Sequence, residues 1–228
     1  MVIIIPARGG STRIPNKATM EFEGFPMIVH TIARAKRVFP EFPVYVTSDD
    51  DKIRQVAMDH GAIPLERESP ENSNSTTSMF IPCAAAVRRL GMAGHAKVLI
   101  LWACAPTLRD KWLRGGHKMS QSLPNSSVFA AVESRYPSRN VMVPSKHGLS
   151  FKYAEDGARW GVQDSSTEVK EYYNAGLFAF VPRNHLLVYE TIYHECAPYQ
   201  VPRWDTIDID TEDDLKEAKL ILENRKHG

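Results

Sequence analysis

Residues 2–17 read Val-Ile-Ile-Ile-Pro-Ala-Arg-Gly-Gly-Ser-Thr-Arg-Ile-Pro-Asn-Lys, so that an apolar, β-branched run leads directly into a basic loop with two glycines. The run lacks the polar–apolar alternation of a half-exposed strand. It is therefore typical of a parallel strand that is buried on both faces. The stretch predicts an α/β fold whose first strand, Val2–Ile5, ends at a loop that contacts a ligand.

The loop has the chemistry of a polyphosphate site. Gly9 and Gly10 allow backbone amides to approach an anion, and Arg8, Arg13 and Lys17 supply positive charge. The loop is not a Walker A motif, and it lacks the G-x-G-x-x-G of dinucleotide-binding proteins. The alternative is an ordinary glycine turn between a strand and a helix, with solvated cations.

Composition limits the classes of protein that are compatible with the chain. The 28 Lys and Arg nearly balance the 27 Asp and Glu among 228 residues, which argues against a nucleic-acid or anionic-membrane partner. The longest apolar stretch, residues 98–106, is too short to span a bilayer, and residues 1–5 lack the features of a signal peptide. Three widely spaced cysteines fit a reducing compartment without disulfides. We expect a cytoplasmic protein.

Apolar runs that predict strands alternate along the chain with stretches of helical spacing. In residues 51–60, for example, Ile53, Val56 and Ala57 share one helical face, and Gly61 provides a stop. This alternation predicts a doubly wound, mostly parallel, Rossmann-like sheet that is covered on both sides and binds ligands beyond the carboxyl ends of its strands. The predicted strands are Val2–Ile5, Val44–Thr47, Ala62–Leu65, Val98–Ala103 and Val128–Val132, and the predicted helices lie at 25–38, 51–60, 77–90 and 110–121.

Residues 134–173 break the alternation. They are rich in Ser, Pro, Arg, Lys and Tyr and show no clean helical period. An excursion of this length within a compact domain is usually functional. We therefore expect a single domain over residues 1–228 with an inserted β-rich arm at 134–173. The alternative for the arm is a plain surface loop.

A pair of carboxylates near the end of the chain predicts a metal site. Period-two alternation places Ile207 and Ile209 on one face and Asp208 and Asp210 on the other. The Cα atoms of the two aspartates would lie about 7 Å apart, close enough for both to hold one Mg²⁺ next to phosphate. The alternative makes Asp210 a helix-start carboxylate and Asp208 its solvated neighbour. Thr211 is expected to cap the last helix.

Four ordered segments resemble one enzyme family. The loop, in the form P-A-R-G-G-S-x-R-I-P-x-K, is similar to the N-terminal signature of the sugar nucleotidyltransferases that activate nonulosonic acids with CTP. These are the acylneuraminate, pseudaminate and legionaminate cytidylyltransferases. Residues 208–211 match the metal-binding D-x-D-T of the family, and residues 103–109 resemble the A-T-A-P-F-L-R of the pseudaminate branch. Residues 173–178 resemble Y-x-D-A-G-Q-F beside the sugar site, although Asn174 and Leu177 depart from it, as Ala18 departs near the nucleotide.

The resemblance implies roles for individual residues on a nucleotidyltransferase (GT-A-like) fold. The expected catalytic residues are Arg8, Lys17 and Asp208. The expected nucleotide-binding residues are Ala7, Arg8, Gly9, Gly10, Ser11, Arg13, Lys17, Arg67, Thr76 and Thr77. The expected sugar-binding residues are Ala103, Cys104, Arg109, Arg139 and Asn174, and the expected metal ligands are Asp208 and Asp210.

Two of these arginines also have simpler interpretations. Arg67 can donate to the O2 and N3 acceptors of cytosine, which would select against uracil, but it can equally be a solvated loop cation. Arg109 can hold an anionic sugar, but it can equally pair locally at the surface while Asp110 caps the next helix.

We therefore expect transfer of CMP from CTP to the anomeric hydroxyl of a nonulosonic acid, with pseudaminic acid the first choice and sialic, legionaminic or Kdo substrates the alternatives. The expected cofactor is Mg²⁺, with Mn²⁺ as a substitute. The resemblance also implies a homodimer in which the arm reaches the second subunit. A GT-A-type glycosyltransferase and a non-catalytic nucleotide-binding protein are the rival interpretations.

Overall fold

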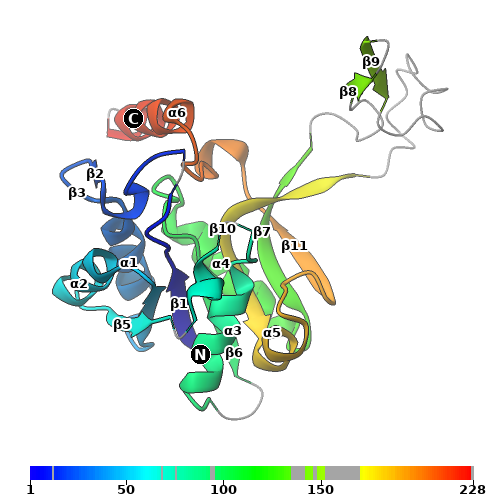
Figure 1. The fold of residues 1–228 in the computed structure, drawn as a ribbon. Coiled ribbons are helices and arrows are strands. Elements are labelled where there is room, and N and C mark those ends of the chain that lie inside the picture. Colours follow the sequence, from blue (N-terminus) through cyan, green and yellow to red (C-terminus); the bar gives the residue numbers. More distant parts are fainter. Residues whose placement is uncertain are drawn as a thin grey trace.

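The computed structural model describes residues 1–11, 13–67, 69–74, 76–92, 96–134, 142–145, 148–151 and 170–226. Its centre is a seven-stranded sheet in which β10 alone runs antiparallel to both of its neighbours. The predicted mostly parallel α/β sheet is thus confirmed (Figure 1). In spatial order the strands are β11 (Cys196–Gln200), β7 (Ser127–Glu133), β10 (Tyr172–Pro182), β6 (Lys97–Leu101), β1 (Val2–Pro6), β4 (Val44–Ser48) and β5 (Ile63–Glu66).

Helices cover both faces of the sheet because neighbouring residues of the central strands point to opposite faces. Ile3 and Ile5 of β1 pack in a core with helices α1, α2 and α4, whereas Ile4 packs in a second core with α3 and α5. All three isoleucines are fully buried, as expected for a strand covered on both sides. The helices are α1 (Met27–Val38), α2 (Asp51–Asp59), α3 (Phe80–Arg89), α4 (Asp110–Ser122), α5 (Arg183–Tyr189) and α6 (Glu212–Lys226).

A third core lies beneath α6 and joins the two ends of the chain. Ile14 from the first loop packs there with Ile207 and Ile209, and Ala218 of α6 is fully buried against them. Thr211 caps α6 as predicted, because its hydroxyl accepts the Asp214 amide at 3.2 Å. This packing brings the acidic segment to the basic loop.

Smaller elements complete the chain. β2 (Glu21–Phe22) pairs with β3 (Phe25–Pro26), and β8 (Met142–Ser145) pairs with β9 (Gly148–Phe151) in a separate two-stranded sheet within the predicted arm. The 3-10 helices are η1 (Lys17–Thr19), η2 (Pro70–Ser73) and η5 (Arg203–Asp205). Among the described residues, no helix is both long enough and apolar enough to cross a bilayer.

The sequence prediction missed β10, α5 and β11. Within β10, Asn174 and Gly176 interrupt the strand pattern, and the pairing with β7 shifts register between Asn174 and Ala179. β11 contains Pro198, which is tolerated because β11 is an edge strand bonded to β7 alone. The five predicted strands and four predicted helices are confirmed, with ends that differ from the prediction by at most three residues.

Candidate active site

A pocket of about 310 Å³ opens at the carboxyl edge of the sheet. It lies where β1 ends, beside β6 on one side and β4 on the other, which is the point at which the strand order reverses. Most of the predicted site residues line it: Ala7, Arg8, Ser11, Arg13, Lys17, Arg67, Thr77, Ala103, Cys104, Asp208 and Asp210.

The first loop is fixed by the strand beside it. The Ala7 amide donates to the Thr47 carbonyl at 3.0 Å, and the Gly9 amide donates to Asp49 Oδ1 at 3.1 Å. A Cβ atom at Gly9 would lie 2.6 Å from Asp50 Oδ2, so only glycine fits between the loop and α2. We predicted that the Gly9 and Gly10 amides face an anion, but the Gly9 amide is bonded to a carboxylate, and neither glycine lines the pocket.

The acidic segment keeps the predicted alternation without joining a sheet. Ile207 and Ile209 are buried, whereas Asp208 and Asp210 turn to the opposite side and line the pocket. The Ile209 amide donates to the Cys104 carbonyl at 3.0 Å, which ties the segment to the loop after β6. The carboxylates therefore lie at the edge of the sheet where the basic loop begins.

Lys17 joins the two clusters directly. Its Nζ lies 2.7 Å from Asp210 Oδ1 and donates to the Ile209 carbonyl at 2.5 Å. Arg13 Nη2 reaches the other oxygen of Asp210 at 2.9 Å. Residues separated by more than 190 positions in the sequence thus meet at one carboxylate.

The charges of these groups depend on their burial and on one another. Burial would lower the pKa of Lys17, but the neighbouring Asp210 and Asp208 carboxylates raise it above its usual value. Burial would raise the pKa of Asp210, but the hydrogen bond and charge of Lys17 and the charge of Arg13 lower it. Burial raises the pKa of Asp208 to about 7, against the opposing effect of Lys17. Asp210 is thus a stable anion, and Asp208 is a carboxylate that lacks enough nearby positive charge.

The donor set fits a hard divalent cation. Two carboxylates face one pocket, and the half-buried Asp208 is the one whose anionic form a bound cation would stabilise. Mg²⁺ needs only one or two protein carboxylates when phosphate oxygens and water supply the remaining ligands. Asp208 and Asp210 are therefore the residues that would hold it.

The wall of the pocket that follows β5 holds the predicted base-reading residues. Arg67 Nη1 donates to Ser73 Oγ at 3.1 Å, and burial lowers the pKa of Arg67. Thr77 donates its hydroxyl proton to the Glu71 carbonyl at 2.7 Å, so the hydroxyl is already oriented. Thr76 is exposed and lies outside the pocket lining.

The wall of the pocket that follows β6 is formed by apolar side chains, two of them small. Ala103 and Cys104 line the pocket next to Trp102, a large residue to which the sequence analysis gave no role. Burial raises the pKa of the Cys104 thiol to about 12, so this group is an uncharged packing residue and not a nucleophile.

The structure does not bring every predicted sugar-binding residue to the pocket. Arg109 lies outside the lining, and its Nε pairs with Oδ1 of the buried Asp205 at 3.0 Å, a partner 96 positions away and not the local surface partner that we gave as the alternative. Asn174 also lies outside the lining; its amide group donates to the Tyr193 hydroxyl at 2.9 Å, and its Oδ1 accepts the Gly176 amide. Arg139 lies outside the described residues.

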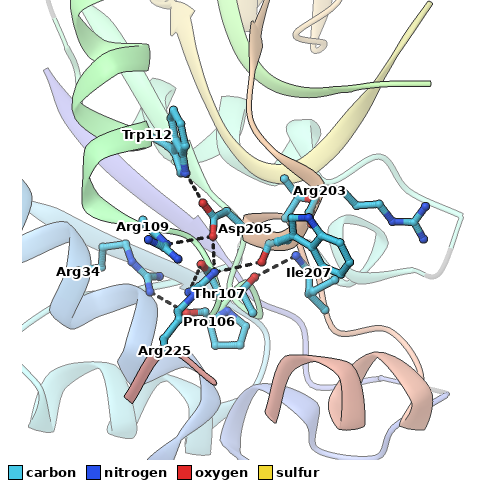
Figure 2. Close-up of polar contacts among 11 residues, drawn as sticks. Arg34, Pro106, Thr107, Arg109, Trp112, Arg203, Asp205, Ile207 and Arg225 are labelled. Carbon is cyan, nitrogen blue, oxygen red and sulfur yellow. Dashed lines mark hydrogen bonds and ion pairs between the residues drawn. The ribbon is translucent and has the colours of Figure 1, made fainter. Parts of the chain in front are cut away.

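A polar network around the buried Asp205 joins the loop after β6 to residues 203–207 and to α6 (Figure 2). Asp205 accepts from Arg109 Nε, from Arg225 and, at 2.6 Å, from the Trp112 indole. Arg34 donates to the Ala105 and Pro106 carbonyls and is itself buried, which lowers its pKa to about 10. The sequence analysis missed this network, because its members are scattered over five segments and no motif joins them.

Gly176 is another residue whose importance the sequence did not reveal. It has φ +65°, and a Cβ atom there would lie 2.8 Å from Asp208 Oδ2. We predict that Gly176→Ala lowers kcat/KM for the transfer reaction expected from the sequence about tenfold to a hundredfold by displacing Asp208, as for other residues that orient metal ligands.

A matched variant separates this collision from backbone strain. Gly91 has φ +57°, and its Cβ position meets nothing within 4 Å. Gly91→Ala should therefore cost similar stability, measured by urea unfolding, while its rate stays close to that of the wild type. Equal rates for the two variants would show that the approach of Gly176 to Asp208 has no effect on the reaction.

The chain is similar to known proteins over nearly its whole length. A sequence model described as Cytidylyltransferase matches residues 2–100. Pseudaminic acid cytidylyltransferase of Campylobacter jejuni is 30% identical over 225 residues, which cover 96% of this chain and 94% of the relative. N-acylneuraminate cytidylyltransferase of Streptococcus agalactiae is 26% identical over 219 residues, which cover 94% of this chain and 51% of the relative. Among solved structures, CMP:2-keto-3-deoxy-manno-octonic acid synthetase complexed with CTP superposes with a TM-score of 0.69 and 18% identity, with 98% of both chains covered.

Proposed function

Because the chain belongs to the cytidylyltransferase family, we propose that it transfers CMP from CTP to the anomeric hydroxyl of a nonulosonic acid and releases pyrophosphate. The observation that carries this proposal is the meeting of the basic loop and the acidic pair in one pocket, where Lys17 Nζ lies 2.7 Å from Asp210. Positive charge for a triphosphate and carboxylates for its cation are then within reach of the same ligand.

The reaction needs positioning and charge neutralisation more than covalent chemistry. The sugar hydroxyl attacks the α-phosphorus in line, the bond to the β-phosphate oxygen breaks, and pyrophosphate leaves. Arg8 and Lys17 stabilise the negative charge that develops on the leaving group, and the Ser11 hydroxyl supports the phosphates. Arg13, which is 64% exposed, has room to turn from Asp210 to a phosphate.

Asp208 and Asp210 would hold Mg²⁺, or Mn²⁺ in its place, at the phosphates. When bound, the ion would neutralise phosphate charge and make the sugar hydroxyl easier to deprotonate. The chain itself fixes Asp210 between Lys17 and Arg13 and places the Asp208 carboxyl group in the same pocket.

Pseudaminic acid is the substrate that we propose first, because a pseudaminic acid cytidylyltransferase is similar over 96% of this chain. The small side chains of Ala103 and Cys104 leave room for a bulky sugar against the loop after β6. We also propose a homodimer formed through the arm at 134–173, and reaction in the cytoplasm, which three free cysteines support.

A coupled pyrophosphate assay tests the proposal. The purified protein is incubated with CTP, UTP, ATP or GTP and with pseudaminic, sialic, legionaminic acid or Kdo. We expect pyrophosphate with CTP and pseudaminic acid, and no release without the sugar. Release with sialic acid instead would move the substrate within the family. CTP binding without turnover of any sugar would indicate a non-catalytic relative, and consumption of a nucleotide sugar would indicate a glycosyltransferase.

Metal affinity should depend on pH through Asp208, because the cation binds the carboxylate and not the carboxylic acid. With the pKa of Asp208 at about 7, the Mn²⁺ dissociation constant should stay level above that pH and rise about tenfold for each pH unit below it.

The stability of the metal-free protein should change with pH in the opposite direction, because higher pH favours metal binding but lowers the free energy of unfolding. Native Asp208 keeps a proton that the unfolded chain has lost, so the free energy of unfolding falls as pH rises from about 4 to 7. Calorimetric Mn²⁺ titrations from acidic to neutral pH check the first trend, and a flat profile would contradict it.

A further inference from the structure

Thr107 lies outside the pocket lining and yet contacts the segment that carries the acidic pair. It is fully buried in the loop after β6. Its hydroxyl oxygen accepts the Ile207 amide at 3.0 Å, and its carbonyl accepts Arg225 Nη1 at 2.7 Å (Figure 2).

The hydrogen bonds on either side of Asp208 set the direction of its side chain. Before it, the Ile207 amide is held by the Thr107 hydroxyl. After it, the Ile209 amide is held by the Cys104 carbonyl at 3.0 Å, and the Ile209 carbonyl accepts from Lys17. Of the hydrogen bonds that the Ile207 and Ile209 amides donate, only the one to Thr107 is accepted by a side chain.

Thr107 can act as a fixed point because its own loop is held from two sides. Arg225 bonds the Thr107 carbonyl, the Trp204 carbonyl at 3.0 Å and the Asp205 carboxylate. Arg34 donates to the Pro106 carbonyl at 2.9 Å. The loop is thus anchored to α6 and α1, which leaves the hydroxyl little freedom to follow a shift of Ile207.

We propose that Thr107 is a positioning residue for Asp208, which it orients toward a bound divalent cation through the Ile207 amide. The inference rests on the proposed function only in that Asp208 holds the metal. Without the hydroxyl, the Ile207 amide is buried without its acceptor, and the peptide that leads into Asp208 is free to rotate.

The test measures Mn²⁺ binding directly, by electron paramagnetic resonance of free Mn²⁺ in titrations of the purified full-length protein. Thr107→Val removes the hydroxyl and keeps the shape, whereas Thr107→Ser keeps the hydroxyl. We expect the Mn²⁺ dissociation constant to rise about tenfold in Thr107→Val, as for other residues that support a metal ligand, and to stay near the wild-type value in Thr107→Ser. Thr206→Val is the matched control, because the Thr206 hydroxyl donates to the Arg203 carbonyl within its own turn.

The outcomes separate this inference from the proposed function. If Thr107→Val shifts the urea midpoint but binds Mn²⁺ as the wild type does, Thr107 has a structural role only and the inference is wrong. If Thr107→Ser loses as much affinity as Thr107→Val, the hydroxyl is not the group that matters. If Asp208→Asn binds Mn²⁺ like the wild type, the metal site itself is wrong, and both proposals fail together. Should Thr107→Val not fold, Thr107→Ala carries the same comparison.

Discussion

Asp208→Asn is expected to lower kcat/KM for CMP transfer about a thousandfold, the loss typical when one preorganised charge at a reacting phosphoryl group is removed. The substitution keeps the size of the side chain and removes its negative charge from the pocket. Lys17 and Arg13 keep their ion pairs with Asp210, but the cation has one anionic ligand fewer. Pyrophosphate release at saturating CTP measures the effect.

Asp213→Asn is the matched control for this variant. Asp213 lies in the first turn of α6, its side chain is 91% exposed, and it pairs with Lys216 at the surface. Its loss should leave the rate close to that of the wild type, because an exposed pair contributes little and lies outside the pocket. If the two variants lose activity equally, the loss reflects general charge and not the metal site.

Asp205→Ala is expected to lower the free energy of unfolding by about 3–5 kcal/mol, the range found when one member of a buried ion pair is removed. Asp205 is 5% exposed and accepts from three donors that come from α4, α6 and the loop between β6 and α4. Removing the carboxylate leaves the half-buried guanidinium of Arg225 and the half-buried indole of Trp112 without this partner. Urea unfolding followed by tryptophan fluorescence measures the change.

Asp51→Ala gives the comparison for a surface pair. Asp51 is 96% exposed, and its contact with Arg54 lies within one helical turn. It should cost less than about 1 kcal/mol, as exposed pairs usually do. If Asp205→Ala lowers the free energy of unfolding by no more than Asp51→Ala does, then Arg109 and Arg225 find other partners. The network around Asp205 would then not be what holds the loop after β6 to α6.

The sequence was sufficient for the parts of the fold that depend on local pattern. The β-branched run of β1 and the helical spacing of α2 are local signals, and both elements form where they were predicted. β10 was missed because its pattern is broken by Gly176, whose value lies in contact with Asp208 and not in strand propensity. The antiparallel direction of β10 depends on how the chain re-enters the sheet after the arm, and the local sequence pattern does not predict this direction.

The sequence predicts site residues well where a single segment contains all the residues of a motif at the expected spacing. The basic loop and the Asp208–Asp210 alternation are of this kind, and both line the pocket. Arg109 was not predicted to pair with Asp205, because its charge suits a ligand or a carboxylate equally, and only the fold brings Asp205 to it. Asp205 could not be found, because its three side-chain partners lie up to 96 positions away in the sequence.

The arm begins at the end of β7 and ends at the start of β10, and these two strand ends pair with each other. Glu133 of β7 faces Tyr172 of β10, and the Ser134 amide donates to the Glu171 carbonyl at 2.8 Å. The two strands on either side of the arm are therefore held together by their own antiparallel pairing. We therefore expect a change in the length of the arm to leave the pairing of β7 with β10 in place.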